Sequence, residues 1–161
     1  MIDRKRTAIG GLVVSAALLV GIAVNEGYSP VAYEPVKGDR PTLGFGQANG
    51  VRMGDKTNPV RALIQLQGSV DKYAQALQYC IKVPLYQYEY DAYMDLAYNI
   101  GTGAFCGSTL VKKLNASDYA GACREILKWD KFHGATLDGL KQRRMKEYRQ
   151  CIGEKNGLLA Q

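Results

Sequence analysis

Three basic residues, Arg4-Lys5-Arg6, are followed by an uncharged and largely apolar run from Thr7 to Val24. A basic flank followed by an apolar segment is typical of an export signal or a membrane anchor. The run is about 18 residues long, which is barely enough to cross the hydrocarbon core of a bilayer. Because glycine, alanine and hydroxyl residues dilute it, we expect its insertion into a membrane to be marginal.

Three interpretations of this segment are open: a cleaved signal peptide, a permanent anchor, or a weak signal-anchor that exports the rest of the chain and later leaves the bilayer. Cleavage near Ala23 would leave Glu26 almost at the new terminus, and permanent anchors are usually richer in leucine and phenylalanine. We therefore favour the weak signal-anchor. The basic flank then predicts a cytoplasmic N-terminus, with the residues after Asn25 on the outer side of the membrane.

The composition is that of a globular protein, because 47% of the 161 residues are apolar and 22% are charged. This length suggests one domain, or one domain with two lobes. A net charge of +6 favours an acidic partner but is too diffuse to indicate nucleic acid, so we expect none. The cysteines have no C-x-x-C spacing and no histidine partners, so we expect no metal site. They suit one or two disulfides in an oxidising compartment, with all three pairings open: Cys80, Cys106, Cys123 and Cys151.

Short strand-like segments come first and helical spacing follows, which predicts an α+β fold. Tyr33–Val36 and Thr42–Gly46 are strand-like around a Lys37-Gly38-Asp39 turn, and together they predict a small β-hairpin. Helices are predicted from Pro59 with Asn58 as N-cap, from Pro84 to Gly101, over residues 108–114, from Asp118, and from Leu137 or Asp138 to near Gly153. The last helix carries basic residues that we expect to form a solvated face: Arg143, Arg144, Lys146 and Arg149.

One carboxylate, Glu26, stands at the end of the apolar run. Apolar neighbours and the negative pole of a helix both favour the protonated acid at such a position. A general acid that cleaves a glycosidic bond needs this affinity for its proton, and a second polar or acidic group must lie across the cleft from it. The predicted hairpin supplies candidates for that second group: Glu34, Asp39 and Thr42. The alternative is a charged loop that only flanks an anchor.

Several motifs together resemble those of the phage-type lysozymes (endolysins), the muramidases of T-even and lambdoid phages. Glu26-Gly27, Tyr33 and Thr42-Leu43-Gly44-Phe45-Gly46 resemble the active-site signature of that family. Tyr98–Phe105, Ser108-Thr109-Leu110 and Leu137–Leu140 with Arg143, Arg144 and Glu147 resemble its later segments. The resemblance implies a lysozyme-like fold with a small β lobe (26–57) and a larger helical lobe (58–161), preceded by an N-terminal apolar helix.

The resemblance also implies roles for individual residues. Glu26 would protonate the leaving oxygen, while Thr42 and a second carboxylate would position the attacking water and give inversion. The family's second acid would fall at Pro35, so the match departs there. Asp39 is our choice for the displaced carboxylate, Glu34 is next, and a site with only Glu26 and Thr42 stays open. Substrate contacts are implied for Tyr33, Gly46, Tyr98, Asn99 and Ser108.

The weakly apolar start resembles the signal-anchor-release segment of a subset of endolysins, which implies residues 1–25 as that segment. Such an enzyme is tethered to the inner membrane through residues 7–24, facing the periplasm, and is inactive until the membrane is depolarised. The expected function is then hydrolysis of the β-1,4 bond between N-acetylmuramic acid and N-acetylglucosamine in peptidoglycan, by a monomer without a cofactor. Two rival functions are a lytic transglycosylase and a membrane-tethered wall-binding protein without turnover.

Overall fold

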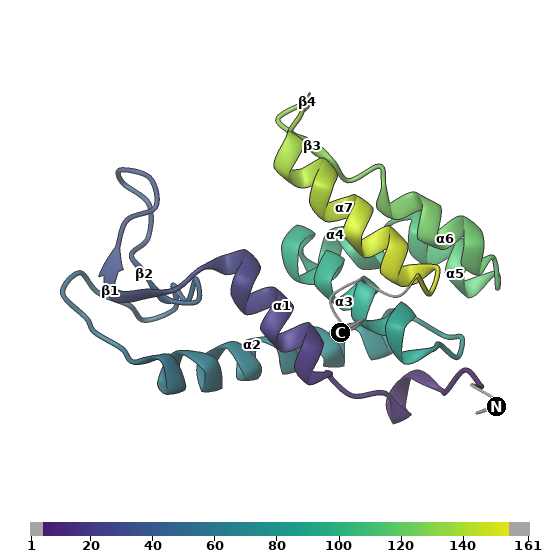
Figure 1. Cartoon of the computed structure of the whole chain (residues 1–161), viewed down its shortest axis with the longest axis horizontal. Helices are drawn as coiled ribbons and strands as arrows, with labels where there is room; N and C mark the ends of the chain where they lie inside the picture. Colours follow the sequence, from purple (N-terminus) through teal and green to yellow (C-terminus); the bar gives the residue numbers. More distant parts are fainter. Residues whose placement is uncertain (1–4, 155–161) are drawn as a thin grey trace. The chain divides into compact units, whose positions relative to one another are not determined.

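The computed structural model describes residues 5–154, which divide into two compact units. The hairpin unit spans Val14–Lys72, and the helical unit consists of the residues up to Val13 together with those from Tyr73 onward. Helices dominate both units and the sheets are small (Figure 1). The expected combination of a helical majority with small strands is thereby confirmed.

The hairpin unit contains helix α1 (Ala16–Glu26), strands β1 (Ser29–Tyr33) and β2 (Thr42–Gly44), and the start of helix α2 (Pro59–Cys80). The strands pair antiparallel, with Tyr33 opposite Thr42 and Ser29 opposite Gly44. As predicted, Asn58 caps α2, since its Oδ1 accepts the Arg61 N–H at 2.9 Å. The first strand ends at Tyr33 rather than at Val36, because Pro35 has no N–H to donate to a ladder.

The N-terminal apolar run does not form one continuous helix. A single 3-10 turn, η1 (Ile9–Gly11), is followed by extended residues, and α1 begins only at Ala16, where the Ser15 hydroxyl accepts the Leu18 N–H at 3.0 Å. The glycines at 10 and 11 and the capping serine set this boundary. Among the described residues, no helix is both long enough and apolar enough to cross a membrane.

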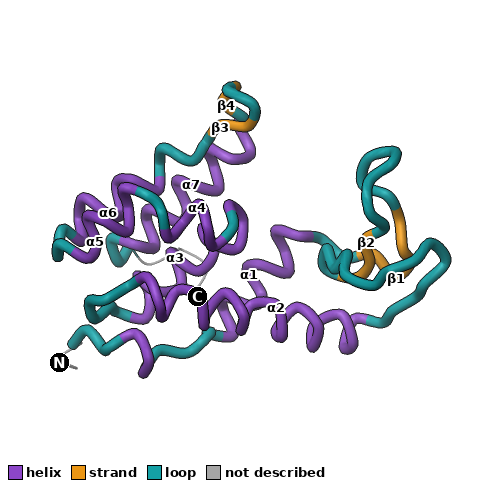
Figure 2. Tube along the Cα trace, turned by 180° about the vertical axis from the view of Figure 1, so that it is seen from behind, coloured by secondary structure: helices purple, strands orange, loops and turns teal. Residues whose placement is uncertain are grey.

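The described part of the helical unit contains η1, the end of α2 and the helices α3 (Gln87–Ile100), α4 (Thr102–Cys106), α5 (Thr109–Asn115), α6 (Tyr119–Ile126) and α7 (Asp138–Cys151). A hairpin of two strands of two residues each, β3 (Lys131–Phe132) and β4 (Ala135–Thr136), precedes α7 (Figure 2). Helix α3 is the centre of this unit, because every residue from Glu89 to Ala97 is buried and α7 packs against it. Helix α5 packs against α6 in the same unit.

In the helical unit one predicted boundary is wrong and two elements were not predicted, α4 and the β3–β4 hairpin. Helix α3 begins at Gln87 rather than at Pro84, because the Glu89 carboxylate accepts the N–H of Tyr86 at 2.8 Å and fixes the first turn there. The chain does not stay irregular after Gly101: this glycine takes a φ of 88°, turns the chain and starts α4 at once.

All four cysteines are paired, Cys80 with Cys106 and Cys123 with Cys151. The first bridge joins the end of α2 to the end of α4, and the second joins α6 to the last residue of α7. The expectation of disulfides is confirmed, and one of the three open pairings is selected. Each bridge closes a loop of moderate length, 26 and 28 residues.

Removing either bridge is expected to lower stability substantially. Loop-closure entropy for these separations gives about 3.5 kcal/mol for each bridge, or roughly 10 °C in melting temperature for a chain of this size. The double variants C80S/C106S and C123S/C151S, compared with the oxidised wild type by calorimetry, measure this loss. Peptide mapping without reductant should find only these two cross-links, and a peptide joining Cys80 to Cys123 or Cys151 would contradict the pairing.

Candidate active site

Glu26 is the last residue of α1, and its side chain is half-buried. Gly27 ends the helix with a φ of 72°, while its N–H donates to the carbonyl of Ala23 at 3.1 Å. The carboxylate therefore stands at the carbonyl end of a helix made of apolar residues, where partial negative charge gathers. This is the position that the sequence predicted for a proton donor.

The Thr42–Gly46 motif builds a tight turn beside Glu26. Leu43 and Gln47 exchange two backbone hydrogen bonds, at 2.8 and 3.0 Å, and so close the turn that contains Gly46. Gly46 takes a φ of 79°, and a Cβ at this position would lie only 3.3 Å from Oε2 of Glu26. The turn thus brings backbone, without a side chain, against the carboxylate, and Glu26 and Gly46 are two predicted site residues that the fold places together.

Helix α2 holds this turn from the other side. Gln47 Nε2 donates to the Ser69 hydroxyl at 3.0 Å, and that hydroxyl lies 3.2 Å from Gln47 Oε1. Gly44 has a φ of 64°, and a Cβ on it would meet the Cβ of Ala62 at 2.9 Å. Glycine is therefore required at 44 both by the backbone conformation and by the close packing on α2. The structure thus explains why positions 44 and 46 of the motif are both glycine.

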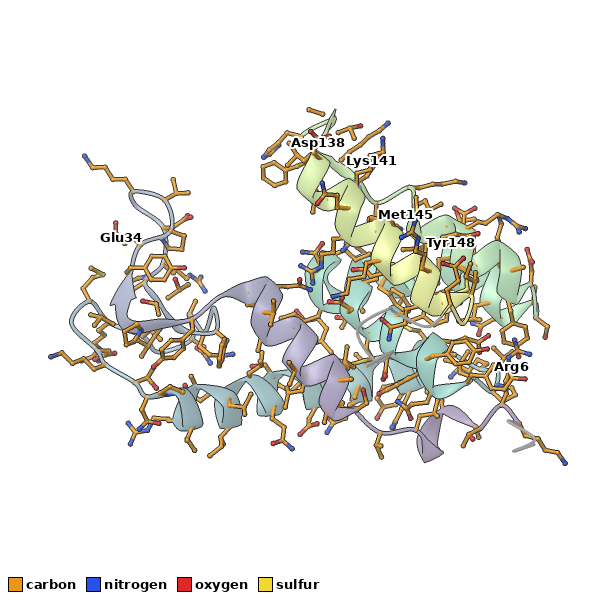
Figure 3. All side chains as sticks on the ribbon, in the orientation of Figure 1. Arg6, Glu34, Asp138, Lys141, Met145 and Tyr148 are labelled. Carbon is orange, nitrogen blue, oxygen red and sulfur yellow. A yellow bond between two sulfur atoms is a disulfide. The ribbon has the colours of Figure 1, made fainter. Side chains whose placement is uncertain are left out.

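The other predicted residues of the hairpin have separate positions. Tyr33 and Thr42 face each other across the strands, and the Thr42 hydroxyl donates to the Tyr33 carbonyl at 3.4 Å. Asp39 lies exposed in the connecting loop, where its N–H donates to the Val36 carbonyl at 2.9 Å. Glu34, labelled in Figure 3, uses Oε2 to accept the Gly38 N–H at 3.2 Å, so this carboxylate stabilises the loop itself.

In the helical unit, Asn99 is held by a buried arginine. Arg144 is 1% exposed, and its Nη1 donates to Asn99 Oδ1 at 2.9 Å and to the Trp129 carbonyl at 3.4 Å. An arginine can only donate, so the oxygen of the Asn99 amide must face it and the NH₂ group must turn away. Since Asn99 itself is exposed, this amide presents a hydrogen-bond donor to the solvent.

The other two predicted contacts in this unit have structural partners. The ring of Tyr98 lies 4.9 Å from that of Tyr73, and the Ser108 hydroxyl caps α5 by accepting the Val111 N–H at 3.3 Å. Ser108 also lines an open pocket together with Glu125, Lys128 and Trp129. Within the described residues, no group of histidine, cysteine, aspartate or glutamate side chains could hold a metal ion.

A family model described as phage lysozyme matches residues 23–147 of this chain. The chain belongs to the phage lysozyme family. An endolysin of Acyrthosiphon pisum secondary endosymbiont phage 1 is 40% identical over 138 residues, which cover 83% of this chain and 94% of that relative. A SAR-endolysin of Enterobacteria phage P21 is 29% identical over 150 residues, covering 90% of this chain and 91% of the relative. The solved endolysin from Escherichia coli O157:H7 phage FAHEc1 superimposes with a TM-score of 0.81 at 33% identity, over 91% and 97% of the two chains.

Membership of the phage lysozyme family implies a muramidase-type glycosidase that acts in peptidoglycan hydrolysis, and the resemblance found in the sequence motifs is confirmed.

Sequence reasoning missed the charged network on the buried side of α7. The expected solvated face is wrong for Arg143 and Arg144: Arg143 pairs with Asp95 at 2.8 Å, and Arg144 pairs with Glu147 at 2.6 Å. Lys146 and Arg149 remain exposed as expected. Only the Arg-Arg-x-x-Glu spacing hinted at this network, since it puts opposite charges on one helical face. Asp138, Lys141 and Met145 are exposed on this helix and Tyr148 is half-buried; Figure 3 labels all four.

Burial raises the pKa of Glu147 to about 7, against the lowering effect of Arg144. The folded lysozyme therefore holds this proton more tightly than the unfolded chain, whose glutamates titrate near pH 4.5. The resulting stabilisation is fully present below about pH 4.5 and is lost as the pH rises through about 7.

The variant E147Q, which keeps an oxygen to accept from Arg144, is expected to remove this part of the pH dependence. Between pH 5 and pH 8 the free energy of unfolding should fall by roughly 2–3 kcal/mol more in the wild type than in E147Q. Urea unfolding at both pH values measures the difference. The exposed residue Glu154 supplies the control, because E154Q should follow the wild-type curve; parallel curves for wild type and E147Q would contradict the assignment.

Proposed function

We propose that this phage lysozyme hydrolyses the β-1,4 bond between N-acetylmuramic acid and N-acetylglucosamine in peptidoglycan, with Glu26 as the general acid. The observation that carries the proposal is the approach of the Gly46 turn to the Glu26 carboxylate, at the end of an apolar helix. A carboxylic acid in this position donates its proton to the bridging sugar oxygen as the bond breaks. A water then attacks the sugar from the opposite face, which inverts the configuration at the reacting carbon.

We assign the second carboxylate to Asp39, acting with the Thr42 hydroxyl on the attacking water. Pro35 occupies the place of the family's second acid, and neighbouring residues of the hairpin carry the remaining carboxylates. Glu34 is already engaged with the Gly38 N–H, whereas Asp39 is exposed in the same loop. An inverting reaction requires the two carboxyl groups to be about 6.5–9.5 Å apart in the working enzyme, which leaves room for the water.

Residues 1–25 are proposed as a signal-anchor-release segment, and residues 26–161 as the catalytic domain, with lobes at 26–57 and 58–161. The basic flank, the marginal apolar run and the similarity to a SAR-endolysin support this proposal. The enzyme would be tethered in the host inner membrane through residues 7–24, facing the periplasm, and would become a soluble periplasmic monomer after release. The two disulfides suit that oxidising compartment.

The variant E26Q is expected to abolish hydrolysis while the protein folds normally. Loss of a general acid lowers the rate by about 10²- to 10⁴-fold, so purified E26Q should not clear a suspension of peptidoglycan on the time scale of the wild type. Under the same assay D39N should lose about 10-fold or more, and E34Q should keep most of the activity.

Melting temperatures close to the wild type are the control for all three variants. A fully active E26Q would contradict the proposal. Mass spectrometry of the wild-type digest identifies the reaction, because hydrolysis adds one water to each cleaved bond, whereas a lytic transglycosylase would leave an anhydro product.

We propose that the donor amide of Asn99 binds an oxygen of the sugar chain, such as a hydroxyl or an acetamido carbonyl. Arg144 fixes the direction of this amide, as the donor-only chemistry of the guanidinium requires. The other proposed substrate contacts are Tyr33, Gly46, Tyr98 and Ser108.

The variant N99D separates binding of substrate from support of the fold. Aspartate keeps an oxygen that accepts from Arg144 and replaces the outward NH₂ donor with a charged oxygen that can only accept. We expect KM to rise about fivefold with little change in melting temperature, the effect of losing one hydrogen bond of roughly 1 kcal/mol. N99A, which loses both contacts, should also melt at a lower temperature. An unchanged KM in N99D would show that the amide does not contact the substrate.

A further inference from the structure

Arg6, from the basic flank of the apolar run, is half-buried and contacts three side chains of the helical unit: Glu89, Tyr86 and Tyr119. Its Nε and Nη2 donate to the two oxygens of Glu89, at 3.1 and 2.8 Å. Its guanidinium carbon lies 3.6 Å from the ring centre of Tyr119 and 4.5 Å from that of Tyr86. A planar guanidinium is suited both to a two-point contact with a carboxylate and to stacking on aromatic faces. Figure 3 labels Arg6.

Glu89 is buried, and Arg6 is the cation that pairs with it. The Glu89 side chain is 3% exposed, and one of its oxygens also accepts the N–H of Tyr86 at the first turn of α3. A carboxylate that is buried to this extent needs a cation beside it. The cation that the structure provides comes from 83 positions earlier in the chain.

The residues after Arg6 are fastened to the same end of α3. Thr7 and Leu85 exchange two backbone hydrogen bonds, at 2.8 and 2.9 Å. Six residues later, the carbonyl of Val13 accepts a hydrogen bond from Gln87 Nε2 at 2.8 Å. Residues 6–13 therefore contact the helical unit at three points. Arg6 makes an ion pair, and the backbone of Thr7 and of Val13 makes hydrogen bonds.

We propose that Arg6, Glu89, Tyr86 and Tyr119 form a latch that closes only after the anchor leaves the membrane and that keeps it from returning. The inference rests on the proposed tethering of residues 7–24. In the tethered chain the positive flank keeps Arg6 on the cytoplasmic side, while Glu89 is exported, so the two side chains are separated by the bilayer. After release they lie on the same side, and Arg6 neutralises the buried carboxylate.

The latch also gives a physical reason for inactivity before release. Without Arg6, the first turn of α3 holds a buried and uncompensated carboxylate, at the start of the helix around which the helical unit packs. Release of the segment and completion of this unit are then one event. The charge that orients the segment in the membrane becomes the charge that fixes it to the folded enzyme.

The chain offers a matched control for this proposal. Lys5 precedes Arg6, carries the same charge in the basic flank and has an exposed side chain. K5Q and R6Q therefore alter the charge of the flank equally, but only R6Q removes the latch. E89Q removes the latch from the other side without changing the flank, and glutamine still offers an oxygen to the Tyr86 N–H.

The experiment uses the full chain carrying E26Q, so that lysis does not disturb the membranes. Cells expressing it are depolarised with an uncoupler, and the soluble protein is purified and mixed with vesicles of phosphatidylethanolamine and phosphatidylglycerol. We expect the wild type and K5Q to stay in solution, and R6Q and E89Q to sediment with the vesicles at least several-fold more. Trypsin should also cut after Arg6 at least tenfold faster in E89Q than in the wild type, because the docked segment opens more often. Cleavage after the exposed Arg52, in the hairpin unit, should be unchanged.

Equal vesicle binding by K5Q, R6Q and E89Q, or equal cleavage after Arg6 in E89Q and wild type, would overturn the latch. If the chain is not tethered, the wild type will be found in the soluble fraction of polarised cells. That result would also overturn the latch, because the latch requires a tethered state to follow. Failure of the muramidase assignment is visible only in the activity of chains with and without E26Q.

Discussion

The close approach of backbone to the Glu26 carboxylate is the constraint from which the candidate site follows. A Cβ at position 46 would stand 3.3 Å from the carboxylate oxygen, which is tighter than ordinary contact, and the positive φ there disfavours any side chain in any case. The turn can come this close only because α2 supports it through Ser69 and because Gly44 lets the strand lie on Ala62. The carboxylate at the end of α1 therefore lies against a turn that later elements of the chain hold in place.

The parts of the fold that could be predicted are those with local causes. The end of α1 at Glu26, the hairpin with Thr42 in its second strand and the capped start of α2 each depend on residues within a few positions of one another. The disulfide pairing has no such local cause, because four separated cysteines allow every pairing. The burial of Arg144 was hidden as well, since its partner Asn99 lies 45 positions away and a basic run by itself indicates solvent. A two-residue strand such as β3 is too short to show the alternation of apolar and polar residues by which strands are predicted.

The N-terminal segment has a composition compatible both with the folded protein and with the membrane-bound state that we propose. Leu18 and Ile22 are buried in the folded chain, whereas Val20 and Val24 on the same helix remain exposed. A helix selected only for the interior of a soluble protein would carry polar residues at such exposed positions. Gly10 and Gly11 lie in the 3-10 turn η1, and Ser15 caps α1, so residues that dilute the apolar run also lie where its helix is interrupted. The same residues underlie the marginal insertion that we propose for the tethered chain.

Two ion pairs in this lysozyme, Arg144–Glu147 and Arg6–Glu89, differ in how far apart their partners lie in the sequence. Arg144 and Glu147 lie three positions apart on one helix, so their pairing forms whenever that helix forms and cannot be withheld. Arg6 and Glu89 are brought together only by the final position of the N-terminal segment. A buried charge whose partner arrives from a distant segment makes stability conditional on the location of that segment. A long-range pair such as Arg6–Glu89 can respond to a change of compartment, because one partner can be held elsewhere. A pair within one helix, such as Arg144–Glu147, can only stabilise the fold.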